Sequence, residues 1–300
     1  MINSAKPGTH GWLLIDKPEG ITSAQVVAKI KRLVGEKVGH AGTLDPLATG
    51  ILPLALGEAT KTAGYVTCAD KAYRFSIQWG ESRSTEDREG EITAVSDVLP
   101  SDDAIKEALS HFAGEIDQIP PQFSAIKVDG KRAYDLARQG QEFELKSRRV
   151  HLYSFVCLGS DNGQSTFEVH CSKGTYVRSL SRDLARHLGA CGHISMLRRI
   201  KLGRFVEADT ISLDKCEELV HNADLGKALL PLDRLLDDIP VLSVNSEQAK
   251  RLRFGQVIPV TEAIAATQTQ TEVRVVFEGS LLAFGVCQGG MLKPKRIINL

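Results

Sequence analysis

Residues 39–50, GHAGTLDPLATG, hold a single carboxylate in a run of mostly small residues. The glycines and alanines allow the backbone to come close to a bulky ligand. Pro46 fixes its own φ and disfavours helical geometry at Asp45, so this loop can present one acid rigidly. An isolated Asp-Pro pair is more often an ordinary turn in which the aspartate caps its own backbone. The rest of the chain decides between these two interpretations of Asp45.

Length and composition predict a globular protein of two domains, or of one large domain with an appendage. The chain has 300 residues, and its 42% of hydrophobic residues suffice for a sizeable core. No run of about 18 apolar residues could span a bilayer, and residues 1–10 lack the hydrophobic region of a signal peptide. We therefore expect a cytoplasmic protein without a membrane partner. The six cysteines are scattered singly, which indicates neither a zinc site nor a disulfide framework.

The charges are unevenly distributed, although 37 basic residues balance 37 acidic ones. Residues 120–206 hold 15 basic and 7 acidic side chains, a net charge of +8, whereas residues 81–119 have a net charge of −8. A positive face for phosphates is therefore compatible with overall neutrality. The alternative is that these charges pair with each other across the fold.

Hydrophobic periodicity predicts a mixture of strands and helices. Residues 72–79 alternate between apolar and polar side chains with a period of two, which is typical of a strand. A helix is expected to begin at Thr22 or Ser23 and to end at Gly35. Further strands are expected at residues 11–15, 150–158 and 166–171, and further helices at residues 102–112 and 175–188. Because these elements follow no regular βαβ order, we expect an α+β fold with a mixed, largely antiparallel sheet.

The chain is expected to divide near residue 238. Residues 1–238 form a first domain of catalytic size, and residues 239–300 form a small β-rich second domain. Strand candidates in the second domain are residues 257–260, 272–277 and 281–287, before a basic tail at residues 293–296. Within the first domain, residues 80–91 are expected to be a solvated acidic connection.

Several classes of chemistry lack their sequence motifs. The chain has no Gly-x-x-x-x-Gly-Lys-Ser/Thr, Gly-x-Gly-x-x-Gly, His-Glu-x-x-His or Gly-x-Ser-x-Gly. This argues against the use of nucleoside triphosphates or dinucleotides and against zinc proteases and serine hydrolases. The eight histidines do not cluster, so we expect no metal site and no cofactor. His40, in the Asp45 loop, is equally compatible with a bond to the backbone and with a substrate contact.

Two further segments combine basic and apolar side chains. Residues 171–180 run from a strand end through a glycine turn into a helix, on which Arg178, Arg182 and Arg186 recur every four residues. Such a row of arginines is usually a solvated helix face. Residues 197–201, LRRIK, continue the basic character.

Six motifs occur in order along the chain. They are Asp16-Lys17-Pro18-x-Gly20-x-Thr22-Ser23, Gly39-His40-x-Gly42-Thr43-Leu44-Asp45-Pro46-x-Ala48-x-Gly50, Lys71-x-Tyr73, Pro120-Pro121-x-x-Ser124-Ala125-x-Lys127, Gly174-Thr175-Tyr176-x-Arg178 and Leu197-Arg198-Arg199. Together they resemble the TruB family of tRNA pseudouridine synthases. The resemblance covers roughly residues 10–205, and the last 60 or so residues are similar to the small β domain, of PUA type, that many members carry.

The resemblance implies a pseudouridine synthase fold and the isomerisation of uridine to pseudouridine at position 55 in the T loop of tRNA. This reaction detaches the base from ribose C1′, rotates it and rejoins it through C5, with no net redox change. Asp45 would be the nucleophile, attacking either C1′ or C6, without a cofactor. Arg178 would hold Asp45 ionised, and Tyr73 would stack on the uracil and assist proton removal at C5. On its own, Tyr73 would be assigned to the core and Arg178 to the helix surface.

The resemblance also implies contacts with tRNA. A uridine in a folded loop is stacked and must be flipped out to reach Asp45. His40 is expected to enter the space that the base leaves, and the C-terminal domain is expected to hold the acceptor-stem side. The other residues expected to bind substrate are Tyr176, Leu197, Lys17 and Lys127.

One segment departs from the family pattern. After the strand at residues 72–79, members commonly read Gly-x-x-Thr-Asp-Thr-x-Asp, whereas Arg83 and Ser84 replace Thr and Asp here. The resemblance therefore leaves the role of residues 80–91 open.

Two alternatives to this enzyme stay open. The chain could be a non-catalytic RNA-binding or RNA-folding protein that needs only its basic face, and a tRNA-folding activity could also accompany catalysis. It could instead be a pseudouridine synthase of a guide-RNA particle, although a chain this short without charged tails favours bare tRNA. We expect a monomer with no obligatory protein partner.

Overall fold

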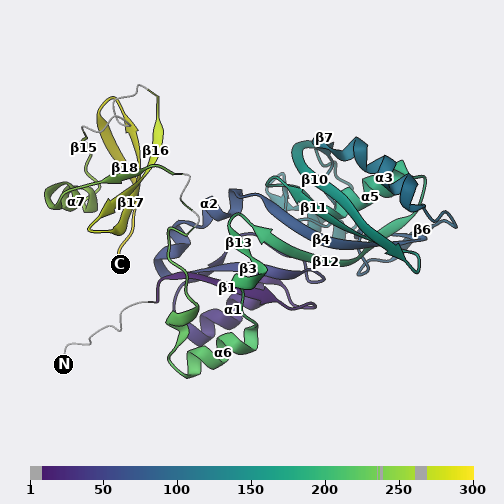
Figure 1. Ribbon diagram of the computed structural model, residues 1–300, viewed down its shortest axis with the longest axis horizontal. Helices are drawn as coiled ribbons and strands as arrows, with labels where there is room; N and C mark the ends of the chain where they lie inside the picture. Colours follow the sequence, from purple (N-terminus) through teal and green to yellow (C-terminus); the bar gives the residue numbers. More distant parts are fainter. Residues whose placement is uncertain (1–8, 235, 237–238, 261–268) are drawn as a thin grey trace.

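The computed structural model describes residues 9–234, 236, 239–260 and 269–300. The strands of its main sheet are β1 (Gly11–Lys17), β2 (Val38–His40), β3 (Thr49–Leu56), β4 (Lys71–Trp79), β7 (Gly114–Gln118), β10 (Arg148–Asp161), β11 (Gln164–Cys171), β12 (Gly192–Leu202) and β13 (Phe205–Val206). They follow the order β1-β3-β12-β4-β11-β10-β7, with β2 beside β3 and β13 beside β12 (Figure 1). Within the described chain, β3 and β12 run parallel and the other neighbours antiparallel. The predicted mixed, largely antiparallel sheet is confirmed.

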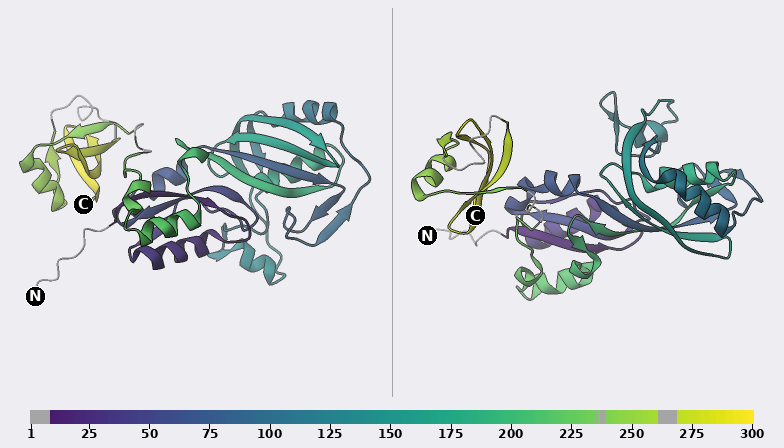
Figure 2. Two further views of the ribbon diagram at one scale, coloured as in Figure 1. Left: turned by 60° about the horizontal axis from the view of Figure 1, so that its bottom comes forward. Right: turned by 45° about the horizontal axis from the view of Figure 1, so that its top comes forward.

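Helices cover this sheet towards both of its ends. They are α1 (Ser23–Val34), α2 (Ala63–Cys68), α3 (Asp102–Leu109), α4 (Ala133–Arg138), α5 (Val177–His187) and α6 (Leu213–His221). α1 and α6 lie together beside β1, whereas α3 contacts β10 and α5 contacts β12 (Figure 2). Apolar side chains from both groups join the sheet in one core, including Ile30 of α1 and Leu180 of α5. The resulting α+β architecture places the start of α5 close to the sheet.

Side chains at the helix ends explain where the predicted helices begin and end. Thr22 Oγ1 accepts a hydrogen bond from Gln25 N at 3.1 Å, and Oε1 of Gln25 accepts one from Thr22 N at 2.8 Å. Gly35, with φ of 72°, closes α1 in the left-handed conformation that glycine adopts easily. Ser101 caps α3 by accepting a hydrogen bond from Ala104 N at 3.2 Å.

A second sheet is built by the C-terminal strands. These are β14 (Val241–Ser243), β15 (Ile258–Pro259), β16 (Thr271–Phe277), β17 (Ser280–Gln288) and β18 (Met291–Ile297), accompanied by α7 (Ser246–Arg253). The sheet stands beyond one end of the main sheet, next to α2 (Figure 1). Tyr65 of α2 stacks on Phe284 with ring centroids 4.8 Å apart. The small β-rich C-terminal domain is confirmed, but the expected basic tail is wrong, because residues 293–296 pair with β17 as part of β18.

The segment after β4 differs from the expected solvated connection. It contains β5 (Glu81–Arg83), which pairs with β6 (Ile92–Val95), and a turn between them that returns to the main sheet. Asp87, at this turn, is only 2% exposed and forms an isolated bridge with Ile194 of β12. The acidic composition of the segment concealed this burial because the charged partner of Asp87 lies far along the chain.

Gly50 lies where β3 and β12 run side by side. Its φ is +92°, and a Cβ at this position would collide with the carbonyl oxygen of its partner Arg199. We therefore expect Gly50→Ala to lower the free energy of unfolding by more than about 3 kcal/mol in urea denaturation. The matched control is Gly64→Ala in α2, where a Cβ meets nothing within 4 Å. That control is expected to raise stability by up to about 1 kcal/mol, and equal stabilities of the two variants would contradict this explanation.

Candidate active site

The loop that carries Asp45 is fixed by the segment between β1 and α1. Ser23 Oγ accepts a hydrogen bond from Leu44 N at 2.9 Å and donates one to Leu44 O at 3.0 Å. Gly20 N donates to Pro46 O at 2.9 Å. The two motifs that flank α1 in the sequence are thus joined in space, and the first holds the second in place.

Lys17 is fully buried beneath the same loop. Its Nζ donates to the carbonyl oxygens of Pro18, Ile21 and Pro46 at 2.8, 2.6 and 3.1 Å. Burial lowers the pKa of Lys17 to about 8, an effect that the carboxylate of Asp45 opposes. Lys17 was expected to bind substrate, but its amine donates to backbone carbonyl groups. It also lies outside the lining of the Asp45 cavity described below.

Arg178, near the start of α5, reaches Asp45. Its Nε lies 2.9 Å from Oδ2 of Asp45. The Arg178 side chain is only 6% exposed, whereas that of Asp45 is 36% exposed. The solvated helix face suggested by the arginine row is therefore wrong for Arg178. The buried guanidinium orients the neighbouring carboxylate by a charge-assisted hydrogen bond and leaves part of it open to a ligand.

Both terminal nitrogens of Arg178 also donate hydrogen bonds. Nη1 donates to Thr85 O and Nη2 to Phe123 O, each at 2.9 Å, and Nε lies 3.7 Å from Oδ2 of Asp87. A buried cation is tolerated only with such partners. Asp87 was not predicted to belong to the site. The one available indication was that it occupies the last position, an aspartate, of the family pattern that begins at Gly80.

Asp45 lines a cavity of about 290 Å³. Arg178, Tyr73, Tyr176 and Leu197 line it as well. The structure thus brings the three residues expected to be catalytic together with two of those expected to bind substrate. They come from the Asp45 loop, from β4, from the first turn of α5 and the residue before it, and from β12.

Two cations that sequence reasoning left unassigned, Lys71 and Arg199, line the same cavity. Arg199 is 1% exposed, and its Nε and Nη2 donate to Ile51 O and Gly42 O at 2.8 and 3.1 Å. Burial lowers the pKa of both residues, that of Lys71 to about 8. The sequence could have indicated both residues as neighbours of the site. A strand with a period of two places residue 71 on the same face as residue 73, and residue 199 on the same face as residue 197.

Tyr73 and Arg199 lie side by side in the cavity wall. Burial raises the pKa of the Tyr73 hydroxyl, and the positive charge of Arg199 opposes this rise. The phenol is therefore neutral near pH 7, and its edge and ring contribute a mostly apolar surface to the cavity.

His40 and Lys127 lie outside the cavity lining. His40 is half-buried on β2, where burial and then Arg199 lower the pKa of its imidazole. Its Nδ1 has no hydrogen-bond partner among the described residues. Lys127 lies on the separate hairpin of β8 (Lys127–Val128) and β9 (Lys131–Arg132), and its side chain is exposed.

Comparison with known sequences identifies the family. Residues 30–177 match the family described as "TruB family pseudouridylate synthase (N terminal domain)". Residues 178–237 match the family described as "tRNA pseudouridylate synthase B C-terminal domain". The chain belongs to the TruB family. It is 50% identical to the tRNA pseudouridine synthase B of Caulobacter sp. (strain K31), with 97% of this chain and 96% of the relative covered. The corresponding protein of Rhodospirillum rubrum is 44% identical over 97% of each chain.

Membership of the TruB family makes the protein a tRNA pseudouridine synthase, an isomerase. Solved structures support the pseudouridine synthase fold. A Cbf5-Nop10-Gar1 complex contains a chain with 25% identity and a TM-score of 0.74, covering 97% of this chain and 85% of that one. An archaeal box H/ACA Nop10-Cbf5 complex gives a TM-score of 0.73 at 24% identity, covering 97% and 86%.

The described part of the chain shows no cluster of metal-binding side chains and no membrane-spanning helix. Within it, no group of three or more histidine, cysteine, aspartate or glutamate side chains is placed to hold a metal ion. None of its helices is long and apolar enough to cross a bilayer.

Lys17 provides a test of how the Asp45 loop is held. Lys17→Met removes three hydrogen bonds while preserving an unbranched side chain of similar length. We expect kcat for pseudouridine formation to fall roughly tenfold to a hundredfold, because small displacements of a reacting group have effects of that size. KM for tRNA should change little. The control is Lys215→Met on α6, where the lysine is exposed and pairs with Glu218, and a similar loss of kcat there would refute a specific role for Lys17.

Proposed function

We propose that this tRNA pseudouridine synthase modifies uridine 55 in the T loop, with Asp45 as its nucleophile. The observation that carries the proposal is the ion pair of Asp45 with the buried Arg178 in a cavity large enough for one pyrimidine base. The carboxylate is held by one buried cation and remains partly open, as a nucleophile requires.

The proposed chemistry keeps the composition of the nucleotide unchanged. Asp45 attacks either C1′ or C6 of the flipped uridine and forms a covalent bond through one carboxylate oxygen. The bond between N1 and C1′ breaks, the base rotates, and C5 bonds to C1′. The bond to Asp45 also breaks before the product leaves, which restores the free carboxylate. The proton on C5 is then lost and N1 gains one, so no oxidant, cofactor or metal is required.

Tyr73 and its neighbours would shape the cavity around the base. The ring of Tyr73 offers a stacking surface, and Leu197 and Tyr176 enclose the uracil from other elements. Because burial raises the pKa of Tyr73, we assign it the role of a proton relay that depends on Arg199 rather than that of a preformed phenolate. His40 and the exposed Lys127 would contact the RNA around the flipped nucleotide, and Lys17 would act through the loop.

We propose a division of labour along the chain. Residues 1–238 would perform catalysis, and residues 239–300, of PUA type, would bind the acceptor-stem side of the tRNA. The basic character of residues 120–206 would supply phosphate contacts to the T stem-loop. The enzyme would act in the cytoplasm as a monomer, without a protein partner or cofactor.

Asp45→Asn tests the proposed nucleophile. The substitution preserves the shape of the side chain, and Arg178 retains its bonds to Thr85 and Phe123. We expect turnover of a tRNA T-stem-loop to fall by roughly 10⁴-fold or more, while its Kd stays within a few-fold. Retained turnover would refute the proposal. Unchanged tRNA folding by this variant would identify an additional folding activity.

The position and the bond can be tested with the same RNA. A T-stem-loop with cytidine in place of uridine 55 should yield no pseudouridine. An RNA with 5-fluorouridine at that position should form an adduct that mass spectrometry locates on Asp45, because fluorine at C5 blocks the final proton loss. Turnover only in the presence of a guide RNA and further proteins would favour the alternative of a guide-RNA particle.

A further inference from the structure

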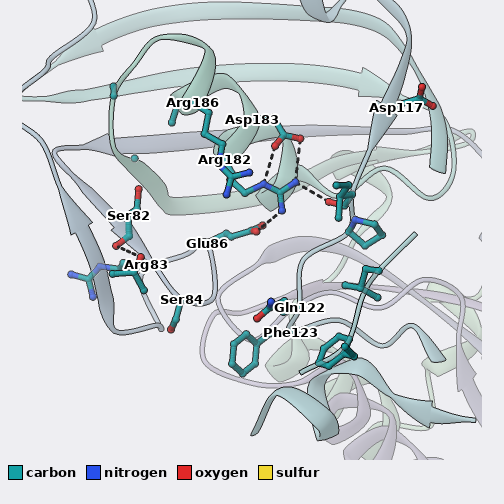
Figure 3. A pocket seen from close by; sticks show the side chains of 18 residues that line it. Ser82, Arg83, Ser84, Glu86, Asp117, Gln122, Phe123, Arg182, Asp183 and Arg186 are labelled. Carbon is teal, nitrogen blue, oxygen red and sulfur yellow. Dashed lines mark hydrogen bonds and ion pairs between the residues drawn. The ribbon is translucent and has the colours of Figure 1, made fainter. Parts of the chain in front are cut away.

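Arg182, one turn after Arg178 on α5, is held by an ion-pair cluster. Its Nη1 lies 2.7 Å from Oε1 of Glu86, and its Nε and Nη2 contact the carboxylate of Asp183 (Figure 3). Nη2 also donates to Ile119 O at 2.8 Å. The Arg182 side chain is 16% exposed, so this residue too departs from the solvated helix face that its spacing suggested.

Arg178 and Arg182 bridge the same two segments of chain. Arg178 bonds to residue 85 of the turn after β5 and to residue 123 of the segment after β7. Arg182 bonds to residue 86 of that turn and to residue 119 of that segment. The second arginine therefore repeats the connections of the first at a distance of one helical turn, farther from Asp45.

Glu86 adopts a backbone conformation that needs support. Its φ of 65° lies in the left-handed region, which residues other than glycine rarely adopt. Its side chain is 15% exposed, and burial raises the pKa of its carboxyl against the opposing effect of Arg182. Glu86 stands between Thr85 and Asp87, the two residues of this turn that contact Arg178. A relaxation at Glu86 would therefore displace both contacts.

We propose that Arg182 and Glu86 form a positioning pair that keeps Thr85 and Asp87 against Arg178 and thereby keeps Arg178 on Asp45. The proposal rests on the proposed catalytic role of Asp45. It also assigns a role to the segment after β4, where this sequence departs from the family pattern: its turn carries one half of the pair.

The turn is also held by hydrogen bonds that do not involve the Arg182–Glu86 ion pair. An effect of the pair on position can therefore be distinguished from an effect on folding. Ile194 N donates to Glu86 O at 3.1 Å, and Arg88 N donates to Ile194 O at 2.9 Å. Arg83 Nη1 donates to Gly90 O at 3.0 Å. Loss of the ion pair thus leaves the turn attached to β12, so the rate of the reaction should fall without loss of the fold.

The side chains of Glu86 and Arg182 face a groove that is separate from the catalytic cavity. Glu86 and Arg182 line a groove of about 690 Å³ together with Ser82, Phe123 and Arg186, as Figure 3 shows. Its lining residues differ from those of the Asp45 cavity. A shortened side chain at either position therefore opens this groove and leaves the lining of the Asp45 cavity intact.

The experiment compares Glu86→Ala, Glu86→Gln, Arg182→Ala, Arg182→Lys and the double alanine variant of the full chain. Single-turnover rates and Kd are measured with a tRNA T-stem-loop, and thermal unfolding checks the fold. We expect each alanine variant to react tenfold to a hundredfold more slowly with Kd within twofold. The double variant should be no slower than the slower single one, because both changes break one interaction. Glu86→Gln and Arg182→Lys should recover part of the rate.

The control is Lys106→Ala on α3, where an exposed lysine pairs with Asp103 outside the groove and outside residues 120–206. It should react within twofold of the parent protein. Parent-like rates of the folded Glu86 and Arg182 variants, multiplicative losses in the double variant, or losses confined to Kd would overturn the proposal. Asp45→Asn is measured in parallel: if it is inactive, such a result refutes the positioning pair alone. If Asp45→Asn retains turnover, the proposed function fails and the positioning proposal fails with it.

Discussion

The burial of the Arg178 guanidinium is the constraint on which the rest of the site depends. A cation that is almost fully removed from water costs several kcal/mol unless charges and hydrogen bonds replace its hydration. Arg178 obtains these from Asp45, Asp87 and the carbonyl groups of Thr85 and Phe123. Three segments that are distant in sequence must therefore meet at the start of α5. The requirement of one charge for partners thus fixes the position of the proposed nucleophile.

Many of the residues in the family motifs support the site without facing its cavity. Lys17 and Ser23 bond to the backbone of the Asp45 loop. Arg198, on the opposite face of β12, pairs with Asp16 at 2.9 Å. Short motifs of this kind contain residues that hold the site by hydrogen bonds as well as residues that line the cavity. A search of the sequence for nucleophiles and bases alone does not identify these supporting residues.

The sequence was most informative where structure depends on neighbours along the chain. The period of two in β4 and the caps of α1 are local, so they could be predicted correctly. β12 was missed because its charged residues suggested a basic cluster, although each arginine is satisfied by a distant partner. The buried Asp87 and the strand β18 were missed for the same reason. Their environment is created by segments that only the folded chain brings close.

The charge of the cavity explains how a protein without net charge can act on a polyanion. Lys71, Arg178 and Arg199 line the cavity with one carboxylate, that of Asp45. Within the described residues, no carboxylate lies within ion-pair distance of Lys71 or Arg199, whose donors are directed at carbonyl groups. The lining thus carries three basic side chains against one acidic one, although basic and acidic residues balance over the whole chain. Because electrostatic attraction acts over roughly 10 Å in salt solution, this local excess matters more for an approaching RNA than the net charge does.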